Sequence, residues 1–265
     1  GSVSWLYYAD RLVEFPLGVF GVAIATVILP KLSSIHANGD ARQFSTTLET
    51  GVRLGWLIAL PCAAGLLLLA APLITTLFGY GAFTNGDVEM SAWSLRAYAL
   101  ALPGFILVKI LAPGFFARQN TRTPVRIGIF AMVSNMAYNI ILVGSMLLMS
   151  LPAAHTGLAL ATALSANQQA FMLFRQLRRE SVLGISVRTR AVIIRSLVAT
   201  FGMMFVIWLV CPDIEQWFAM HAWSRVLTLA GIIGLSVAVY VSTLLLSGVR
   251  PGDFLPAARH SDNQP

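Results

Sequence analysis

Charged residues are scarce in this chain, and so are cysteines. Only 11% of its residues are Asp, Glu, Lys or Arg, whereas a soluble domain carries about 25%. The two cysteines, Cys62 and Cys211, lie far apart in apolar segments, and two such cysteines provide neither a disulfide framework nor the spacing of a metal site. These shortages exclude an ordinary soluble domain and a disulfide-stabilised one, and they predict two buried thiols.

Apolar residues are correspondingly abundant. They make up 57% of the 265 residues, and the mean hydropathy is +0.76. A soluble protein of this length could not hide that much apolar surface, because folding leaves much of the chain in contact with solvent. The solvent is therefore expected to be lipid. The chain opens directly before an apolar run, without an initiator Met or a signal-peptide pattern, which is typical of a piece of a longer membrane protein.

Seven stretches are long and apolar enough to cross a bilayer, which requires roughly 20 mostly apolar residues. They lie near 4–32, 52–79, 88–116, 125–149, 155–177, 191–211 and 225–248. Turn residues such as Asn38-Gly39-Asp40 separate them, and strand-like alternation is missing. The sequence therefore predicts an all-α integral membrane protein with seven transmembrane helices and a polar tail over residues 250–265.

The cations alternate between successive connections. Connections 79–91, 150–155 and 212–224 contain no Lys or Arg and hold four acids instead. Most of the 18 cations flank the other connections or lie in the tail: Lys31, Arg42, Arg53, Arg118, Arg122, Arg126, Arg175, Arg178, Arg179, Arg188, Arg190, Arg195, Arg250 and Arg259. By the positive-inside rule, the chain starts outside and its C-terminus is cytoplasmic. The net charge of +7 thus reflects membrane topology. The sequence lacks the clustered, solvent-exposed basic face that a nucleic-acid-binding protein would have.

Four cations are not needed for this orientation: Arg11, Arg96, Lys109 and Arg225. Arg225 begins a span and is expected to face the outer headgroups. Lys109 is within reach of the cytoplasmic interface, where its long stem allows it to snorkel. Arg96 lies about two turns into its span and faces either the interface or a cavity. Arg11 stands apart because carboxylates flank it on both sides.

Asp10, Arg11 and Glu14 form the main candidate site. A charge inside a bilayer costs at least ~2.5–3.5 kcal/mol, so an intramembrane Arg is by default a hypothesis about function. Spacings of three and four residues make these side chains neighbours on one helix. One interpretation is a self-neutralising cluster that makes insertion tolerable. The other is that Arg11 projects into a water-filled cavity and binds an anionic group, because guanidinium matches phosphate bidentately.

A second polar group lies in the fourth and fifth spans. Asn135 and Asn139 are one turn apart, and Thr162 and the run Asn167-Gln168-Gln169 follow in the next span. Interhelical hydrogen bonds are the ordinary use of such residues in membrane bundles. The alternative is oxygen ligation of a small hard cation. Catalysis finds no support, since the four histidines fall in loops or tails and no metal-binding or phosphate-loop motif is present.

Three long strings resemble the MurJ (MviN) lipid II flippases. They are WLYYADRLVEFP over 5–16, FGYGAFT over 78–84 and VKILAPGFFARQ over 108–119, the first continuing through Gly18-Val19-Phe20-Gly21-Val22-Ala23 and Leu29-Pro30 and the last followed by Thr123-Pro124-Val125. The resemblance covers nearly the whole chain, from what looks like the family's eighth helix to its fourteenth. It implies the exporter fold, in which two six-helix lobes surround a cavity and two additional helices form a lipid-tail groove.

On that resemblance, residues 1–180 form five spans of the second lobe and residues 181–249 the additional pair, while the first lobe and the seventh helix are missing from the chain. The family moves lipid II from the inner to the outer leaflet of the bacterial inner membrane by alternating access, without covalent chemistry. The implied substrate-binding residues are Asp10, Arg11, Glu14 and Arg96, with Arg11 contacting the pyrophosphate-sugar headgroup.

Some family members bind sodium through a motif that matches Asn135, Asn139 and Thr162. Asn139 stands where a carboxylate is often seen, and the acidic partner from the missing helix is absent, so no resident cofactor is expected. Sodium or the membrane potential remains open as the source of energy. The expected partners are lipid II, membrane lipids and the missing first lobe.

Three other functions stay open at this point. The first is a related exporter for another lipid-linked oligosaccharide or a drug. The second is a polyprenyl-phosphate transferase, for which the chain shows no acidic metal motif. The third is a non-transporting membrane scaffold.

Overall fold

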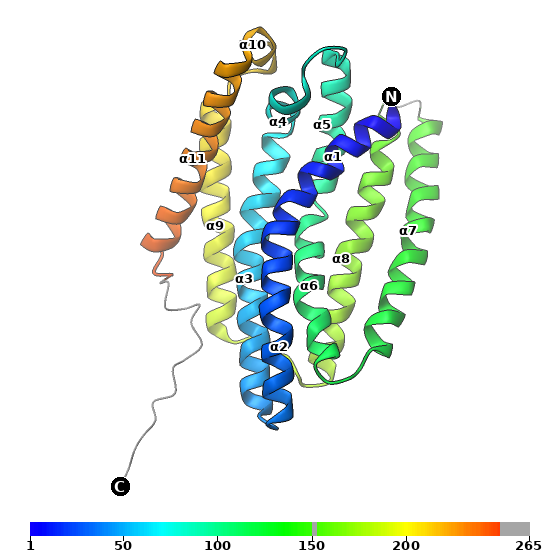
Figure 1. The fold of residues 1–265 in the computed structure, drawn as a ribbon, viewed down its shortest axis with the longest axis vertical. Helices are drawn as coiled ribbons and strands as arrows, with labels where there is room; N and C mark the ends of the chain where they lie inside the picture. Colours follow the sequence, from blue (N-terminus) through cyan, green and yellow to red (C-terminus); the bar gives the residue numbers. More distant parts are fainter. Residues whose placement is uncertain (150–152, 250–265) are drawn as a thin grey trace.

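The computed structural model describes residues 1–149 and 153–249. Within these ranges every regular element is a helix, and the long helices run roughly side by side as one bundle (Figure 1). The polar tail predicted over residues 250–265 lies outside the described residues, as does most of the connection predicted at 150–155. The all-α fold class is confirmed.

The first predicted span is one continuous helical rod in three parts. These are α1 (Ser2–Pro16), the π-helical stretch η1 (Leu17–Val22) and α2 (Ala23–Ala37). Pro16 lacks a backbone N–H and its ring crowds the preceding turn, which disrupts regular α-helical hydrogen bonding. The wider turns of η1 begin immediately after it, and such π-helical turns are often found at functional sites. The rod therefore changes direction between α1 and α2.

The second and third predicted spans are each broken by a proline. The four segments are α3 (Ala41–Leu68), α4 (Ala70–Phe78), α5 (Asn85–Ala99) and α6 (Leu102–Phe116). A proline cannot donate to the carbonyl four residues before it and clashes with that carbonyl. Pro72 lies four residues after Leu68, and Pro103 lies four residues after Ala99. Both breaks therefore fall where the proline removes the helical hydrogen bond.

The remaining helices are α7 (Arg122–Leu148), α8 (Thr156–Arg179), α9 (Val187–Val210), the short α10 (Ile214–Ala219) and α11 (Ala222–Leu246). By length and hydropathy, six helical stretches of the described residues could cross a membrane. The predicted span at 155–177 is α8, which is equally long but less apolar. It tolerates polar residues because it packs against α5, α6 and α7 inside the bundle, away from most lipid contact.

The outer surface of the bundle is apolar. Ile140 of α7, Trp208 of α9 and Leu246 of α11 are 76%, 72% and 89% exposed. By contrast, α6 is buried along much of its length, with Leu102, Ile106, Ile110 and Phe115 among its fully covered residues. Large exposed apolar side chains on the outer helices are expected where the solvent is lipid.

The two ends of the bundle differ in charge. The connections α2–α3, α6–α7 and α8–α9 lie at one end, and the α4–α5 connection, α10 and the N-terminus lie at the other (Figure 1). The first of these ends, hereafter the basic end, carries the cations that the sequence assigns to the cytoplasm. The helices thus alternate in direction as the charge pattern predicts. Which end faces the cytoplasm remains a prediction.

The pair α9 and α11 packs mainly on α3 and α4. Their shared core contains Met203, Trp217 and Ile232. The Tyr240 hydroxyl donates to the Leu57 carbonyl oxygen at 2.7 Å and lies 2.8 Å from the Ser196 hydroxyl. This buried bridge joins α11, α9 and α3. The predicted division at residues 180 and 181 remains a prediction.

Arg225 has partners that the sequence does not predict. Its guanidinium donates to the carbonyl oxygens of Trp217 and Phe218, both at 3.0 Å, and to those of Gly79 and Thr75 at 3.3 and 3.5 Å. The last carbonyls of a helix lack intrahelical donors, and the fork of a guanidinium supplies several donors at once. Arg225 therefore clamps the ends of α4 and α10, and its facing the outer headgroups stays a prediction.

Candidate functional site

The charged cluster of α1 lies on the open face of the first rod. The Arg11 Nη1 donates to the Glu14 Oε2 at 2.7 Å, and the two side chains are 53% and 51% exposed. The guanidinium carbon also lies 4.9 Å from the centroid of the Tyr7 ring. The opposite face of α1 is buried through Ala9, Val13 and Pro16. Arg11 and Glu14 thus neutralise each other, as the first interpretation predicts for these two residues, and Arg11 is still open to a ligand, as the second requires.

The exposed face continues beyond the cluster. Phe15 is 73% exposed, and Val19 and Val22 are each 48% exposed. Spacings of three and four residues place these positions on one helical face with Arg11. A long exposed stripe on the first rod is where another part of a longer protein could pack, or where a cavity could open.

Asp10 and Arg96 are less accessible than Arg11. Asp10 lies on the edge of α1 next to α5 and is close enough to Tyr98 for the two groups to interact electrostatically. The Arg96 guanidinium lies over the Trp93 ring, 5.2 Å from its centroid, and interacts electrostatically with Glu89. Among the described residues, no ion pair joins Arg96 to the acids of α1. The structure thus brings Asp10, Arg11 and Glu14 together on α1 and leaves Arg96 as a separate cation on the adjacent α5.

The predicted cation set lies in a hydrogen-bonded chain between α7 and α8. The Asn139 amide donates to the Asn135 Oδ1 at 3.1 Å, and the Asn135 amide donates to the Ser165 hydroxyl at 3.2 Å. Ser165 in turn donates to the Thr162 carbonyl oxygen at 3.1 Å. The Thr162 hydroxyl donates along its own helix to the Leu158 carbonyl at 3.0 Å. The three residues named by the resemblance are therefore brought into one network.

This network does not fit a sodium ion. A hard cation requires several oxygen ligands, with carboxylates among the strongest. Here the Asn135 Oδ1 already accepts a hydrogen bond from Asn139, so the Asn139 Oδ1, which is buried and accepts no hydrogen bond, is the one neutral oxygen of the pair left for a cation. No cluster of three or more acids, histidines or cysteines occurs in the ranges that the structure describes. The Asn135 amide donates across to α8, which is the ordinary interhelical use of such residues, and the Asn139 amide donates within α7.

The same interpretation holds for the neighbouring amides. The Tyr138 hydroxyl donates to the Gln168 Oε1 at 2.8 Å, and the Gln168 amide donates to the Ser134 hydroxyl at 3.2 Å. The Asn167 amide donates to the carbonyl oxygen of Leu100 at 2.8 Å. The polar residues of α8 thus tie it to α7 and to the break between α5 and α6.

We expect the protein to gain a sodium response only when a carboxylate is added. The full-length parent with the native Asn139 should unfold at the same temperature in sodium and potassium chloride of equal concentration. The Asn139→Asp variant should be more stable in sodium, by roughly 1.4 kcal/mol when sodium is tenfold above its dissociation constant. Thermal unfolding in the two salts measures this. A sodium-specific stabilisation of the native protein would contradict it.

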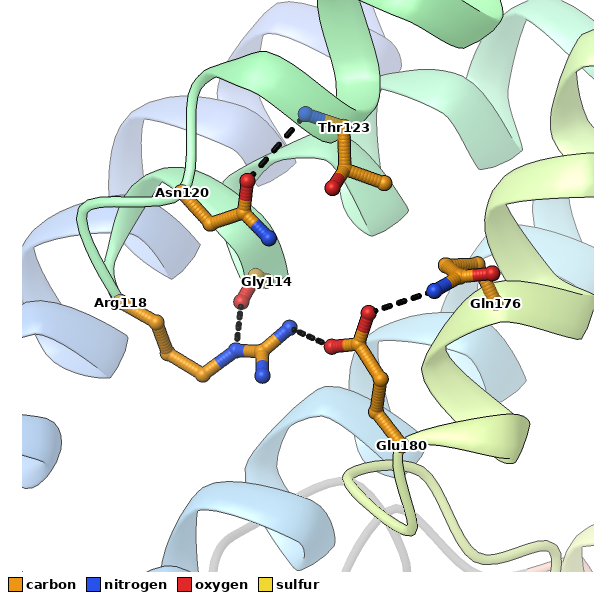
Figure 2. Close-up of polar contacts among 6 residues, drawn as sticks. All are labelled: Gly114, Arg118, Asn120, Thr123, Gln176 and Glu180. Carbon is orange, nitrogen blue, oxygen red and sulfur yellow. Dashed lines mark hydrogen bonds and ion pairs between the residues drawn. The ribbon is translucent and has the colours of Figure 1, made fainter.

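The structure shows a charged network at the basic end that the sequence did not predict (Figure 2). The Arg118 Nη2 donates to the Glu180 Oε2 at 2.7 Å, and its Nε donates to the Gly114 carbonyl oxygen at 3.0 Å. Gln176 donates to the other Glu180 oxygen at 2.7 Å. Asn120 accepts from the Thr123 backbone N–H at the start of α7, at 3.2 Å. The network fastens the α6–α7 turn to the end of α8.

The Glu180 carboxylate gives this network a pH dependence. Burial on its own raises the Glu180 pKa, but hydrogen bonds from Gln176 and Arg118 outweigh burial and hold the pKa below its ordinary value of 4.5. A carboxyl whose pKa is lower in the folded state stabilises the fold above its unfolded pKa, and this stabilisation is lost as pH falls through the folded pKa.

We therefore expect the native full-length parent to be more stable than its Glu180→Gln variant at pH 7, by about 1 kcal/mol or less because the pair is partly exposed. The difference should shrink as the pH falls below about 4.5. Unfolding of both proteins between pH 3 and pH 7 measures it. A difference that stays constant across this range would show that the ion pair does not contribute.

Comparison with known proteins decides the family. The sequence profile described as "Lipid II flippase MurJ" matches residues 1–229. The chain belongs to the MurJ lipid II flippase family. It is 44% identical to a "Probable lipid II flippase MurJ" of Haemophilus influenzae over 94% of its length, and 42% identical to one of Vibrio cholerae over 97%. The chain spans 49% and 48% of these relatives, which is about half of their length.

A solved MurJ structure shows the same fold. The structure described as "Lipid II flippase MurJ, inward closed conformation" superposes with a TM-score of 0.74, covering 93% of this chain and 47% of the other, at 24% identity. This likeness supports the helix arrangement. The resemblance to the MurJ family that the three sequence strings indicate is confirmed.

Polar contacts between distant segments escape sequence reasoning in this MurJ family member, as three examples show. They are the Arg225 clamp, the Arg118–Glu180 pair and the hydrogen bond from the Trp5 ring nitrogen to the Asp87 Oδ1 at 2.7 Å. Only the last has a local signal. Thr84 and Asp87 form a capping box at the start of α5, and this spacing is readable in the sequence.

Proposed function

We propose that the full-length protein containing this chain is a flippase for lipid II, the lipid-linked peptidoglycan precursor. The observation that carries the proposal is Arg11, a guanidinium on an apolar, membrane-length rod that is half exposed and held by a single acid at 2.7 Å. Family membership supplies the substrate class, because the named relatives are lipid II flippases.

The substrate's charge sets the physical problem. A pyrophosphate headgroup cannot cross hydrocarbon unaided, because moving such charge into a low dielectric costs far more than thermal energy. A cavity with a fixed cation replaces part of the lost hydration while the prenyl tail stays in lipid. Guanidinium suits this task because it binds phosphate oxygens bidentately and keeps its charge when partly dehydrated.

The Glu14 carboxylate gives Arg11 a way to release the headgroup. In the absence of substrate, Glu14 accepts the hydrogen bond that a phosphate oxygen would take over. Arg11 would exchange the Glu14 carboxylate for the phosphate, so its charge would be paired both before and after the headgroup binds. Asp10 of α1 and Arg96 of the adjacent α5 complete the proposed substrate-binding set. No covalent bond is made or broken, so the proposed activity is transport and not catalysis.

In alternating access, two lobes would rock around the site and open it to each side of the membrane in turn. The described spans α1 to α8 would supply most of one lobe, and a first lobe from the rest of the protein would supply the other. We further propose that the basic end faces the cytoplasm of a bacterial inner membrane, in line with the positive-inside rule.

The proposal is tested in cells depleted of their own lipid II flippase that express the full-length parent. Growth should be restored, and lipid II should become accessible to a degrading enzyme added outside the cells. If growth is not restored at normal expression, or if only another lipid-linked oligosaccharide reaches the outer leaflet, the proposal is wrong. Cysteine labelling of the α2–α3 turn from either side tests the orientation separately.

A further inference from the structure

A groove between α2 and α3 lies outside the site described above. Its volume is about 650 Å³, and it runs along the two helices from Lys31 and Arg42 at the basic end to Ala23 and Leu54 at the inner end. From Ala23 to Lys31 the rise of a helix gives a length of about 12 Å. This is most of the depth of one bilayer leaflet, since the hydrocarbon core is roughly 30 Å thick.

The walls of the groove are apolar despite three threonines. Ile24, Val27 and Leu54 contribute aliphatic surface. Thr46 donates its hydroxyl to the Arg42 carbonyl oxygen at 3.0 Å, and Thr50 donates to the Thr46 carbonyl oxygen at 2.8 Å. Because these hydroxyls are bonded to their own helix, they need no partner in the groove. The walls therefore suit a hydrocarbon chain.

The floor of the groove is closed by a tight approach of the two helices. A Cβ at Gly51 would lie 2.5 Å from the Ile28 Cδ1. The lack of a side chain at Gly51 leaves room for the Ile28 side chain to pack against α3 at that level. The groove is consequently a shallow channel on the bundle surface, sealed below and open toward the surroundings.

The mouth of the groove is charged, whereas its walls are apolar. Lys31 and Arg42 both line it, from the last turns of α2 and the first turn of α3. Asp40 lines it as well, but its carboxylate accepts the Gln43 backbone N–H at 2.8 Å and caps α3. Two cations against one acid already engaged with its own helix leave the mouth positive, at the level where phospholipid phosphates lie.

We propose that the α2–α3 groove binds an anionic phospholipid, with the phosphate between Lys31 and Arg42 and one acyl chain against Ile24, Val27 and Leu54. The cationic mouth selects a negative headgroup, because each Lys or Arg near an anionic membrane surface adds favourable electrostatic energy. The apolar length of the groove selects an acyl chain over a soluble anion. The bound lipid would fill the groove beside α2 and so support the rod that carries Arg11. This proposal is independent of the transported substrate.

The test uses the purified full-length parent in detergent, titrated with phosphatidylglycerol or phosphatidylcholine, with bound lipids counted by native mass spectrometry. The native protein should retain one phosphatidylglycerol more tightly than phosphatidylcholine. The double variant Lys31→Gln, Arg42→Gln should bind phosphatidylglycerol roughly tenfold more weakly or worse, with phosphatidylcholine unchanged. Val27→Trp, which fills the groove and keeps both charges, should weaken both lipids.

A matched control separates the groove from general surface charge. Arg178→Gln with Arg179→Gln removes two exposed cations from the end of α8, at the same end of the bundle, and should leave lipid binding unchanged. Equal loss in this control would overturn the proposal, as would equal retention of the two lipids by the native protein. If the native parent retains no lipid, its other half covers the groove and the proposal fails. An effect of only one of the two groove variants would also contradict it, because the site needs both mouth and walls.

Discussion

Arg11→Ala in the full-length parent is expected to abolish growth complementation in cells depleted of their own lipid II flippase. Alanine removes the guanidinium that would bind the pyrophosphate and leaves the half-exposed Glu14 carboxylate without its partner at 2.7 Å. An unpaired acid there repels an anionic headgroup. Both changes act in the same direction, so the loss should exceed that from removing a cation alone.

Two further variants show which property of Arg11 matters. Arg11→Lys keeps the charge but loses the planar fork, and it should give partial activity because an ammonium is a point charge. Arg178→Ala is the matched control, since it removes an exposed arginine far from the cluster, and it should complement fully. Growth with Arg11→Ala that equals the native level at equal expression would show that Arg11 serves membrane insertion only.

Gly104→Ala is expected to be strongly damaging, although it adds only one methyl group to the described bundle. Gly104 lies on α6 where it meets α8, and a Cβ there would lie 2.6 Å from both the Ala166 carbonyl carbon and the Asn167 backbone nitrogen. Backbone cannot move aside as a side-chain tip can. The helices must separate, which loosens the packing of Ala101, Ala163 and Ala166. A loss of about 2 kcal/mol or more in unfolding free energy follows from such overpacking.

Gly144→Ala provides the control for this substitution. Gly144 also lies within a long helix, but a Cβ there would meet nothing within 4 Å. The change should be neutral or stabilising by up to about 1 kcal/mol, because alanine favours helix more than glycine does. Thermal unfolding of the purified full-length variants measures both effects. If the two variants melt at the same temperature, the close approach of α6 and α8 is not what Gly104 provides.

Much of the fold could be predicted from the sequence because the bilayer imposes strict local rules. Span lengths, the charge alternation and the helical periodicity are all read within about 30 residues. The prolines also act locally: Pro72 and Pro103 determine where α3 and α5 end. What the sequence could not reveal is that these breaks divide two predicted spans into α3–α4 and α5–α6, since a proline can also kink a helix without ending it.

The candidate site was predictable to a similar degree. Asp10, Arg11 and Glu14 are neighbours along one helix, so their pairing follows from helical spacing. The partner of Arg225 does not, because the carbonyls that it binds come from the ends of α4 and α10. Arg96 illustrates the same limit, since its stacking on Trp93 is local while its separation from the α1 acids depends on how α1 packs on α5.

The sequence by itself determined that this chain is a helical membrane protein of the MurJ family, which end of each span is basic, and which intramembrane cation stands among acids. These properties depend on composition and on spacing along single helices. The tertiary structure alone decided that Arg11 stays open while Arg225 is engaged by carbonyls, that Asn135 and Asn139 join a hydrogen-bonded chain between α7 and α8, and that α2 and α3 leave a groove with a positive mouth. Each of these depends on which helix faces meet, and that is set by packing between segments far apart in the chain.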